Sequence, residues 1–190
     1  MKKIRIWKVI VFSIITLGVY DVVWYILRQR EMESTYDLKI PHWLWMLLPQ
    51  ILTLIVGISV FLFTAITGFT PLSVTLIVAA LLIALATFGL FIWWFLGFSR
   101  AAAKVTANRV PVGWAFALTI LANPAEVIAY QYYFNRYAGD KLPTKQVGPS
   151  KKFKKVAVIV IILSILLSIA GNAIPNPEPQ NTPEKNWLQQ

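Results

Sequence analysis

Charged residues are absent from one long stretch of this chain. Residues 40–99 run for sixty positions without an aspartate, glutamate, lysine or arginine. A soluble domain needs charge on its water-facing surface, whereas about 20 consecutive apolar residues are enough for one helix to cross a bilayer. The stretch has the length of two membrane-spanning helices and a turn, so it predicts an integral membrane protein.

The wider pattern contains five apolar segments and predicts an all-α, multi-pass fold. The second and third segments form a central helical hairpin that turns at residues 67–71, where glycine, threonine and proline interrupt the apolar run. We expect an integral membrane domain over residues 1–173, followed by a disordered polar tail over 174–190, which is rich in proline, asparagine and glutamine. The five apolar segments are residues 6–27, 43–66, 72–98, 112–134 and 156–173.

Composition agrees with this class. The 190 residues are 57% hydrophobic, with a mean hydropathy of +0.63, which suits one small membrane domain with no room for a separate soluble catalytic domain. The absence of cysteine excludes disulfides, thiolate chemistry and a lipoprotein anchor. The first apolar segment continues through Tyr20 and Trp24 without a small-residue cleavage site, so we expect it to be retained.

Lysine and arginine are unevenly distributed between the segments. Four lie at the N-terminus, up to Lys8, three follow the first segment, three follow the third and seven follow the fourth; the hairpin turn has none and the tail has one. If all five segments cross the membrane, the two sides carry 11 and 7 basic residues. If the first and fourth segments dip in and return, or lie in the interface, the sides carry 17 and 1. The positive-inside rule favours the second arrangement, with basic loops in the cytoplasm and the tail outside. Five tilted spanning helices remain the alternative.

The first and fourth segments each contain a candidate helix break. Asn123 suits an N-cap, Pro124 the first helical position and Glu126 the third. Gly18 can likewise interrupt a helix, and Asp21 follows it where a carboxylate favours the new N-terminal dipole. At an offset of 105 residues Gly18 aligns with Asn123 and Asp21 with Glu126, which predicts a weak repeat. The core would then be a pair of broken or re-entrant elements that flank the hairpin, with a C-terminal transmembrane helix.

Asp21 and Glu126 are the only acidic residues in the apolar segments. An ionisable residue at membrane depth is costly and therefore suggests a function. On a helix Asp21 shares a face with Tyr25, and Glu126 shares the matching face with Tyr130. These four residues form a candidate ion or proton site. Capping of the helix starts, or contact with a partner or lipid, would also explain the two acids.

Aromatic and basic residues mark the expected interfaces. Two tryptophans open the second segment and two close the third, so a hairpin would bring them to one aromatic belt. A basic run before the fifth segment anchors that helix, or binds an acidic lipid head group specifically. The candidate interface residues are Trp43, Trp45, Trp93, Trp94, Lys151, Lys152, Lys154 and Lys155. A further stripe, Tyr130, Tyr133, Phe134 and Tyr137, fits either an interfacial amphipathic helix or a helix that leaves the bilayer.

The string Ser13-Ile14-Ile15-Thr16-Leu17-Gly18-Val19-Tyr20 is followed by Trp24 and Arg28, and later by Gln131 and Asn135. These residues resemble the S-I-I-T-L-G-[IV]-Y-x3-W opening and the Q-x3-N element of a family of small bacterial and archaeal membrane proteins, domain of unknown function 4234. The similarity covers about residues 5–140. It implies a multi-pass membrane protein and supplies no activity, substrate or catalytic residue.

Together these patterns predict a non-enzymatic scaffold, accessory or envelope protein of a prokaryotic plasma membrane, acting through helix and lipid contacts. It could assemble with itself or with another membrane protein, and we expect no nucleic-acid partner. His42 is the single histidine, so no usual zinc or histidine-based catalytic site is expected, nor any cofactor. The alternative is a small oligomeric transporter or channel that uses Asp21 and Glu126.

Overall fold

The computed structural model describes residues 3–16, 18–122, 125–137, 139 and 141–173, and the side chains of these residues up to 170. The described residues form helices and no strand, which confirms the predicted all-α class. The predicted tail over residues 174–190 lies outside the described residues. The helices are α1 (Ile6–Ile15), α2 (Val19–Tyr36), α3 (Leu44–Thr67), α4 (Pro71–Val105), α5 (Val112–Ala122), α6 (Ala125–Tyr137) and α7 (Lys151–Ala173).

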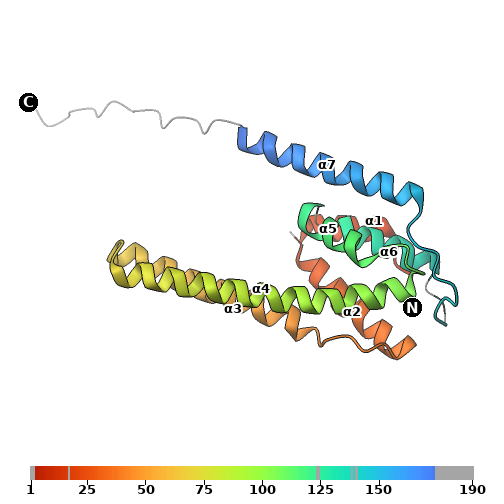
Figure 1. Cartoon of the computed structure of the whole chain (residues 1–190), viewed down its shortest axis with the longest axis horizontal. Helices are drawn as coiled ribbons and strands as arrows, with labels where there is room; N and C mark the ends of the chain where they lie inside the picture. The colour runs from red at the N-terminus through yellow and green to blue at the C-terminus, as the bar shows by residue number, and fades with distance from the viewer. Residues whose placement is uncertain (1–2, 17, 123–124, 138, 140, 174–190) are drawn as a thin grey trace, which may run out of the picture.

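The predicted hairpin is confirmed as α3 and α4, which pack along each other (Figure 1). Its turn is built locally. Gly68 has a φ of 73°, Pro71 opens α4, and Thr70 and Ser73 form a reciprocal capping box. Farther along the hairpin, the hydroxyls of Thr53 and Thr87 are 2.7 Å apart and link the two helices with a hydrogen bond.

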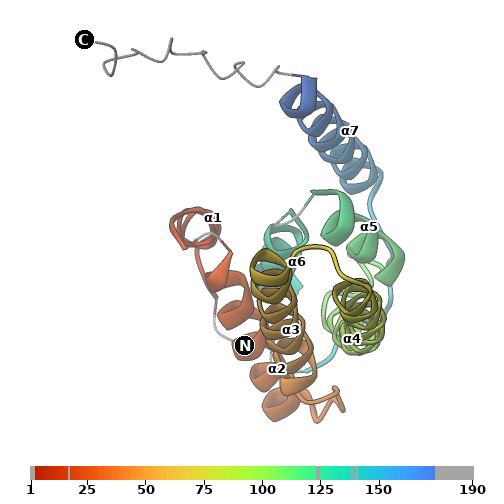
Figure 2. The same cartoon turned by 90° about the vertical axis from the view of Figure 1, so that its left-hand side faces the viewer.

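Helix α4 extends beyond the predicted end of its segment at residue 98. It continues to Val105 because Arg100 and Lys104 occupy its exposed face, while the opposite face stays apolar and buried. Helix α4 packs against α2, α5 and α6 (Figure 2). We define the head as α1, α2, α5, α6 and residues 91–105 of α4. Its fully buried side chains include Trp94, Phe98 and Ala102.

The first and fourth apolar segments are each divided into two helices. Three helices are long and apolar enough to cross a membrane, namely α3, α4 and α7. Helices α1 and α5 have 10 and 11 residues, well short of the about 20 that a span requires. The predicted break at Gly18 is confirmed, with a φ of 88° that glycine adopts readily. Asn123 and Pro124 lie outside the described residues.

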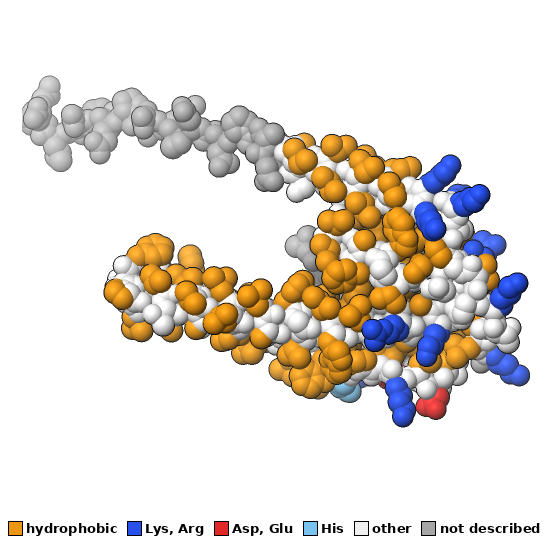
Figure 3. All heavy atoms as spheres, in the orientation of Figure 1, with side chains coloured by type: hydrophobic (Ala, Val, Ile, Leu, Met, Phe, Trp, Pro, Cys, Tyr) orange, Lys and Arg blue, Asp and Glu red, His pale blue; other side chains and the backbone are white. Residues whose placement is uncertain are grey.

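The hairpin and α7 extend from the head in the same general direction and lie apart from one another (Figure 1). Helix α7 packs mainly against α5. In Figure 3 the lysine and arginine side chains of the visible face gather around the head, and apolar side chains cover the hairpin and α7. The four lysines Lys151, Lys152, Lys154 and Lys155 are exposed at the start of α7.

The tryptophans do not form one belt. Trp45 and Trp93 are exposed and their rings pack edge to face at 6.1 Å, as a hairpin predicts. Trp43 is half-buried beside His42, at 5.3 Å between rings. The prediction is wrong for Trp94, which is fully buried. It faces inward because it follows Trp93 directly, and adjacent residues on a helix point about 100° apart.

Candidate functional site

Asp21 and Glu126 both lie in the first turn of a helix that follows a break, α2 and α6 respectively. The buried positions of the two helices match at the offset of 105 that the sequence suggested. Asp21 pairs with Glu126 in this comparison, and Tyr25 with Tyr130. The same offset pairs two further positions that are buried in both helices, at residues 28 and 29 of α2, and four that are buried in one helix and half-buried in the other, at residues 22, 24, 26 and 32. The repeat therefore also holds for burial: corresponding positions of α2 and α6 turn their side chains toward the core.

The Glu126 carboxyl is the centre of a buried polar cluster. It is only 2% exposed, and Oε1 accepts a hydrogen bond of 3.1 Å from the Tyr25 hydroxyl. Its other oxygen, Oε2, has no hydrogen-bond partner among the described atoms. The Tyr130 and Ser99 hydroxyls are also buried, and they interact with each other, since the Ser99 hydroxyl lowers the pKa of Tyr130 against the larger effect of burial. Buried polar atoms normally have partners, so the Oε2 atom of Glu126 suggests a bound proton, ion or water.

Burial governs the protonation of this carboxyl. Desolvation by burial, with a smaller contribution from the negative charge of Asp21, raises the pKa of Glu126 from 4.5 to about 7. The amides of Glu126 and Val127 and the Tyr25 hydroxyl oppose the shift, because they donate to the charged form. Glu126 can therefore gain or lose a proton near neutral pH. Its contact with helix amides also fits the capping interpretation.

Asp21 has a different role in the geometry. Its Oδ1 accepts a short hydrogen bond from Ser13 of α1, which ties the two halves of the first segment together across the Gly18 break. Burial raises the pKa of Asp21, and the Ser13 hydroxyl lowers it. No hydrogen bond joins Asp21 to Glu126 in the described part of the chain, so the two acids influence each other only through their charges. The predicted set of four residues is thus centred on Glu126, with Asp21 beside it.

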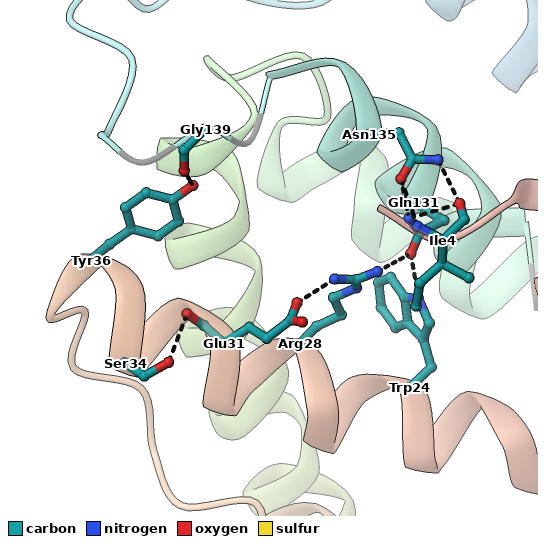
Figure 4. A network of polar contacts seen from close by, with 9 residues as sticks. All are labelled: Ile4, Trp24, Arg28, Glu31, Ser34, Tyr36, Gln131, Asn135 and Gly139. Atoms are coloured by element: carbon teal, nitrogen blue, oxygen red, sulfur yellow. Dashed lines mark hydrogen bonds and ion pairs between the residues drawn. The ribbon is translucent and has the colours of Figure 1, made fainter. Parts of the chain in front are cut away.

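A second buried network was not predicted as a site (Figure 4). The side-chain oxygen of Gln131 accepts hydrogen bonds from the Trp24 indole and from the Arg28 guanidinium, each 2.8 Å long. The Gln131 amide donates to Asn135 at 2.7 Å, and Asn135 donates to the carbonyl of Ile4 at 2.6 Å. This network joins α2 to α6 and fastens the chain before α1. The spacing of Gln131 and Asn135, four residues apart on one helix face, was the signal available in the sequence.

Gln29 makes a similar junction on the other side of α2. Its oxygen accepts from the Trp94 indole at 3.2 Å, and its amide donates to the carbonyl of Pro41 at 2.9 Å. The loop between α2 and α3 is thereby held against α4. A buried glutamine in the middle of a charged helix gave no sign of this from the sequence.

The aromatic stripe of α6 points into the head. Tyr130, Tyr133 and Phe134 are buried, and the ring of Tyr130 packs edge to face on Phe98 of α4 at 5.9 Å. Neither interpretation of the stripe as a lipid-facing surface applies to these three residues. Tyr132, between them, is the exposed one. The stripe is core packing that supports the position of Glu126.

The described residues contain no group of three histidine, aspartate or glutamate side chains that could hold a metal ion. His42 is exposed and accepts a hydrogen bond from the Leu44 amide, at the start of α3. The chemistry that the Glu126 cluster can support is therefore proton or cation binding by one carboxyl and its hydroxyl neighbours.

Fold and cluster together define a helical membrane protein with three candidate spans and a head with two broken helical elements. No protein-family model matches the chain, and the comparisons with curated proteins and with solved structures give no match either.

Proposed function

We propose that this chain is a non-enzymatic scaffold or accessory protein of a membrane, which acts through helix and lipid contacts. One observation carries the proposal: the spans leave most of their apolar surface free. Only 11%, 6% and 11% of the residues in the most apolar parts of α3, α4 and α7 are buried. Such surfaces are available to lipid and to other membrane helices, which associate through close van der Waals packing.

The same observation argues against a pathway through a single chain. The hairpin and α7 lie apart, so the spans of one copy enclose no channel (Figure 1). The buried groups are in the head, where they hold α2, α4 and α6 together. A packed head from which two separate apolar elements extend, the α3–α4 hairpin and α7, suits a protein that organises other membrane proteins or lipids around it.

The proposed topology has the head on the cytoplasmic side, with α1 and α5 entering the bilayer and α2 and α6 returning. The short lengths of α1 and α5 support it, as does the basic surface around the head in Figure 3. The hairpin turn then faces the opposite side.

Because the chain has no cysteine, single cysteines can test this topology with an impermeant thiol reagent in intact cells. Ser34, Lys104 and Phe69 are exposed and suit the purpose; Ala107, just beyond the end of α4, is buried with a φ of 54° and does not. We expect the Phe69→Cys protein to be labelled, and the Ser34→Cys and Lys104→Cys proteins to be labelled only after permeabilisation. Labelling of Ser34→Cys and Lys104→Cys in intact cells, with protection of Phe69→Cys, would instead support five spans.

The scaffold role itself can be tested by photo-cross-linking from the exposed faces of the spans. A photoreactive residue at Leu62 or Ile169, which are 53% and 60% exposed, should yield a discrete protein adduct in native membranes. Asp21→Asn and Glu126→Gln should leave this adduct unchanged. Adducts with lipid alone from every span, or loss of the protein adduct in either isosteric variant, would contradict the proposal.

A second candidate, a small oligomeric transporter or channel, is favoured by the buried Glu126 carboxyl, whose Oε2 has no hydrogen-bond partner among the described atoms. Proteoliposomes with a pH-sensitive or cation-sensitive dye separate the two functions. The scaffold proposal expects no flux between pH 5 and pH 8. Flux that disappears in Glu126→Gln but persists in Asp37→Asn, an exposed acid outside the cluster, would replace it with the transporter.

Membership of the family domain of unknown function 4234 stays a prediction. In its support, the residues that carry the resemblance have structural roles. Ser13 donates a hydrogen bond to Asp21, Gly18 forms the break between α1 and α2, and Trp24 and Arg28 donate hydrogen bonds to Gln131.

A further inference from the structure

A groove of about 790 Å³ runs between α6 and α7, and Ile6 of α1 and Leu118 of α5 also line it. Its size lies within the range of roughly 300–1,000 Å³ typical of ligand pockets. The two helices are antiparallel along it, so residues at the end of α6 lie opposite residues at the start of α7. The groove has two chemically different ends.

The inner end is apolar. It is lined by Leu118 of α5, Ala125 and Ile128 of α6, and Val160 of α7. The floor includes Phe153, which is 8% exposed and packs edge to face on Tyr133 at 5.8 Å. This one aromatic contact bridges α6 and α7, and the small side chains of Ala125, Ala129 and Ala157 leave the remaining space open.

The outer end is cationic. Arg109, Arg136 and Lys152 line it, and the guanidinium groups of Arg109 and Arg136 lie 5.4 and 5.9 Å from the ring centre of Tyr137. Two positively charged guanidinium groups thus lie beside the same tyrosine ring. The ion pair found among the described residues is Arg28 with Glu31, so no described carboxylate neutralises this pair. The Nε of Arg109 is buried without a hydrogen-bond partner in the described structure.

The local backbone explains why these cations meet. Ala107 and Asn108 have φ values of 54° and 59°, which turn the chain sharply after α4. The Ala107 carbonyl accepts hydrogen bonds from the amides of Val147 and Gly148, 2.9 and 3.2 Å long. This clamp brings the start of α7, and with it Lys152, beside Arg109.

We propose that this groove binds one anionic phospholipid of the membrane, with an acyl chain along the apolar end and its phosphate between Arg109, Arg136 and Lys152. Guanidinium groups match the geometry of phosphate oxygens, and charge-assisted hydrogen bonds are stronger than neutral ones. A groove that is apolar at one end and cationic at the other has the polarity of such a lipid along its length. The proposal goes beyond the scaffold function and rests on the proposed topology, because five spans would place Arg109 and Arg136 on opposite sides of the membrane.

Native mass spectrometry of the full chain, with phosphatidylglycerol or phosphatidylcholine of identical acyl chains, tests the site. We expect one phosphatidylglycerol to stay bound under conditions that remove phosphatidylcholine. The double variant Arg109→Gln/Arg136→Gln should weaken this binding by about tenfold or more, since each basic residue near an anionic lipid contributes about 1 kcal/mol. Arg30→Gln/Lys155→Gln is the matched control, because it removes the same charge from exposed positions outside the groove.

Equal losses in the double variant and its control would reduce the effect to general charge and overturn the site, as would wild-type binding in the double variant. If the double variant fails to fold, Lys152→Gln replaces it, because Lys152 is exposed; its expected loss is severalfold, against none for Lys155→Gln. Inorganic phosphate in excess should not displace the lipid. Displacement would mean that the cationic end binds a free anion and that the apolar end adds little affinity for lipid, and would overturn the proposal.

Discussion

The hydroxyl of Tyr25 donates a hydrogen bond of 3.1 Å to Oε1 of Glu126, although 101 residues separate them in the chain. Tyr25 lies in the second turn of α2 and Glu126 in the first turn of α6, so this one bond joins the two broken elements. Phe98 of α4 packs edge to face on Tyr25 at 4.9 Å and holds its ring in place. The two halves of the repeat are thus connected through the Glu126 carboxyl, an ionisable group that is costly to bury.

Removing the Tyr25 hydroxyl should therefore destabilise the head in a pH-dependent way. In Tyr25→Phe, Glu126 loses the donor to Oε1 while Oε2 still lacks one. We expect a loss of about 1–3 kcal/mol at pH 8, where the carboxylate is charged, and a smaller loss at pH 5. Thermal unfolding in detergent at both pH values measures this. Tyr132→Phe, at an exposed ring of α6, is the control, and equal losses at both pH values would contradict the interpretation.

The raised pKa of Glu126 makes a prediction about the wild-type protein. Between the unfolded value of 4.5 and about 7 the folded state binds more protons than the unfolded state, so stability falls as pH rises through this window and levels off above it. A shift of this size corresponds to at most about 3 kcal/mol. The melting temperature should therefore fall from pH 5 to pH 7.

In Glu126→Gln most of that fall should disappear, and the remaining slope reports Asp21, whose pKa burial also raises. Asp37→Asn is the matched control, because Asp37 is exposed with a φ of 52°, a conformation that asparagine also adopts. A wild-type melting temperature that is constant or rises over this window would show that Glu126 stays charged in the folded protein.

Gln131 should be among the most sensitive polar residues of the head. Gln131→Leu leaves the Trp24 indole without its acceptor and takes one acceptor from Arg28, both within the core. We expect a loss of about 2–4 kcal/mol, measured as the change in unfolding free energy in detergent. Gln50→Leu, at an exposed position of α3, should change stability by less than about 0.5 kcal/mol. Similar effects of the two changes would mean that the network contributes little.

The apolar pattern predicted the hairpin and the break at Gly18 because both depend on local chemistry. The turn at Gly68 and Pro71 and the positive φ of Gly18 are properties of single residues and their neighbours. The matching faces of Asp21 and Glu126 could be predicted for the same reason, since position along a helix fixes the face.

What the sequence did not reveal depends on contacts between distant segments. The extension of α4 to Val105 depends on a head that buries one face of a helix whose other face carries Arg100 and Lys104. Trp94 looked like its neighbour Trp93, yet it faces the core, where Gln29 of α2 accepts its indole hydrogen bond. Hydropathy alone could not distinguish a tryptophan at a membrane interface from one in a protein core.

Gly97 is where the loop after α2 passes closest to α4. A Cβ added there would lie 2.5 Å from Cδ and 2.8 Å from Cγ of Pro41. Pro41 cannot withdraw freely, because Gln29 holds its carbonyl at 2.9 Å and Gln29 is itself held by Trp94. Gly97→Ala should therefore push the loop away and strain this junction, at a cost of about 1–3 kcal/mol.

Gly89→Ala is the matched control on the same helix, since nothing lies within 4 Å of its added Cβ. There the gain in helix propensity should raise stability by up to about 1 kcal/mol. Thermal unfolding of both variants in detergent measures the difference, and a Gly97→Ala protein as stable as Gly89→Ala would show that the loop can move without disturbing the head.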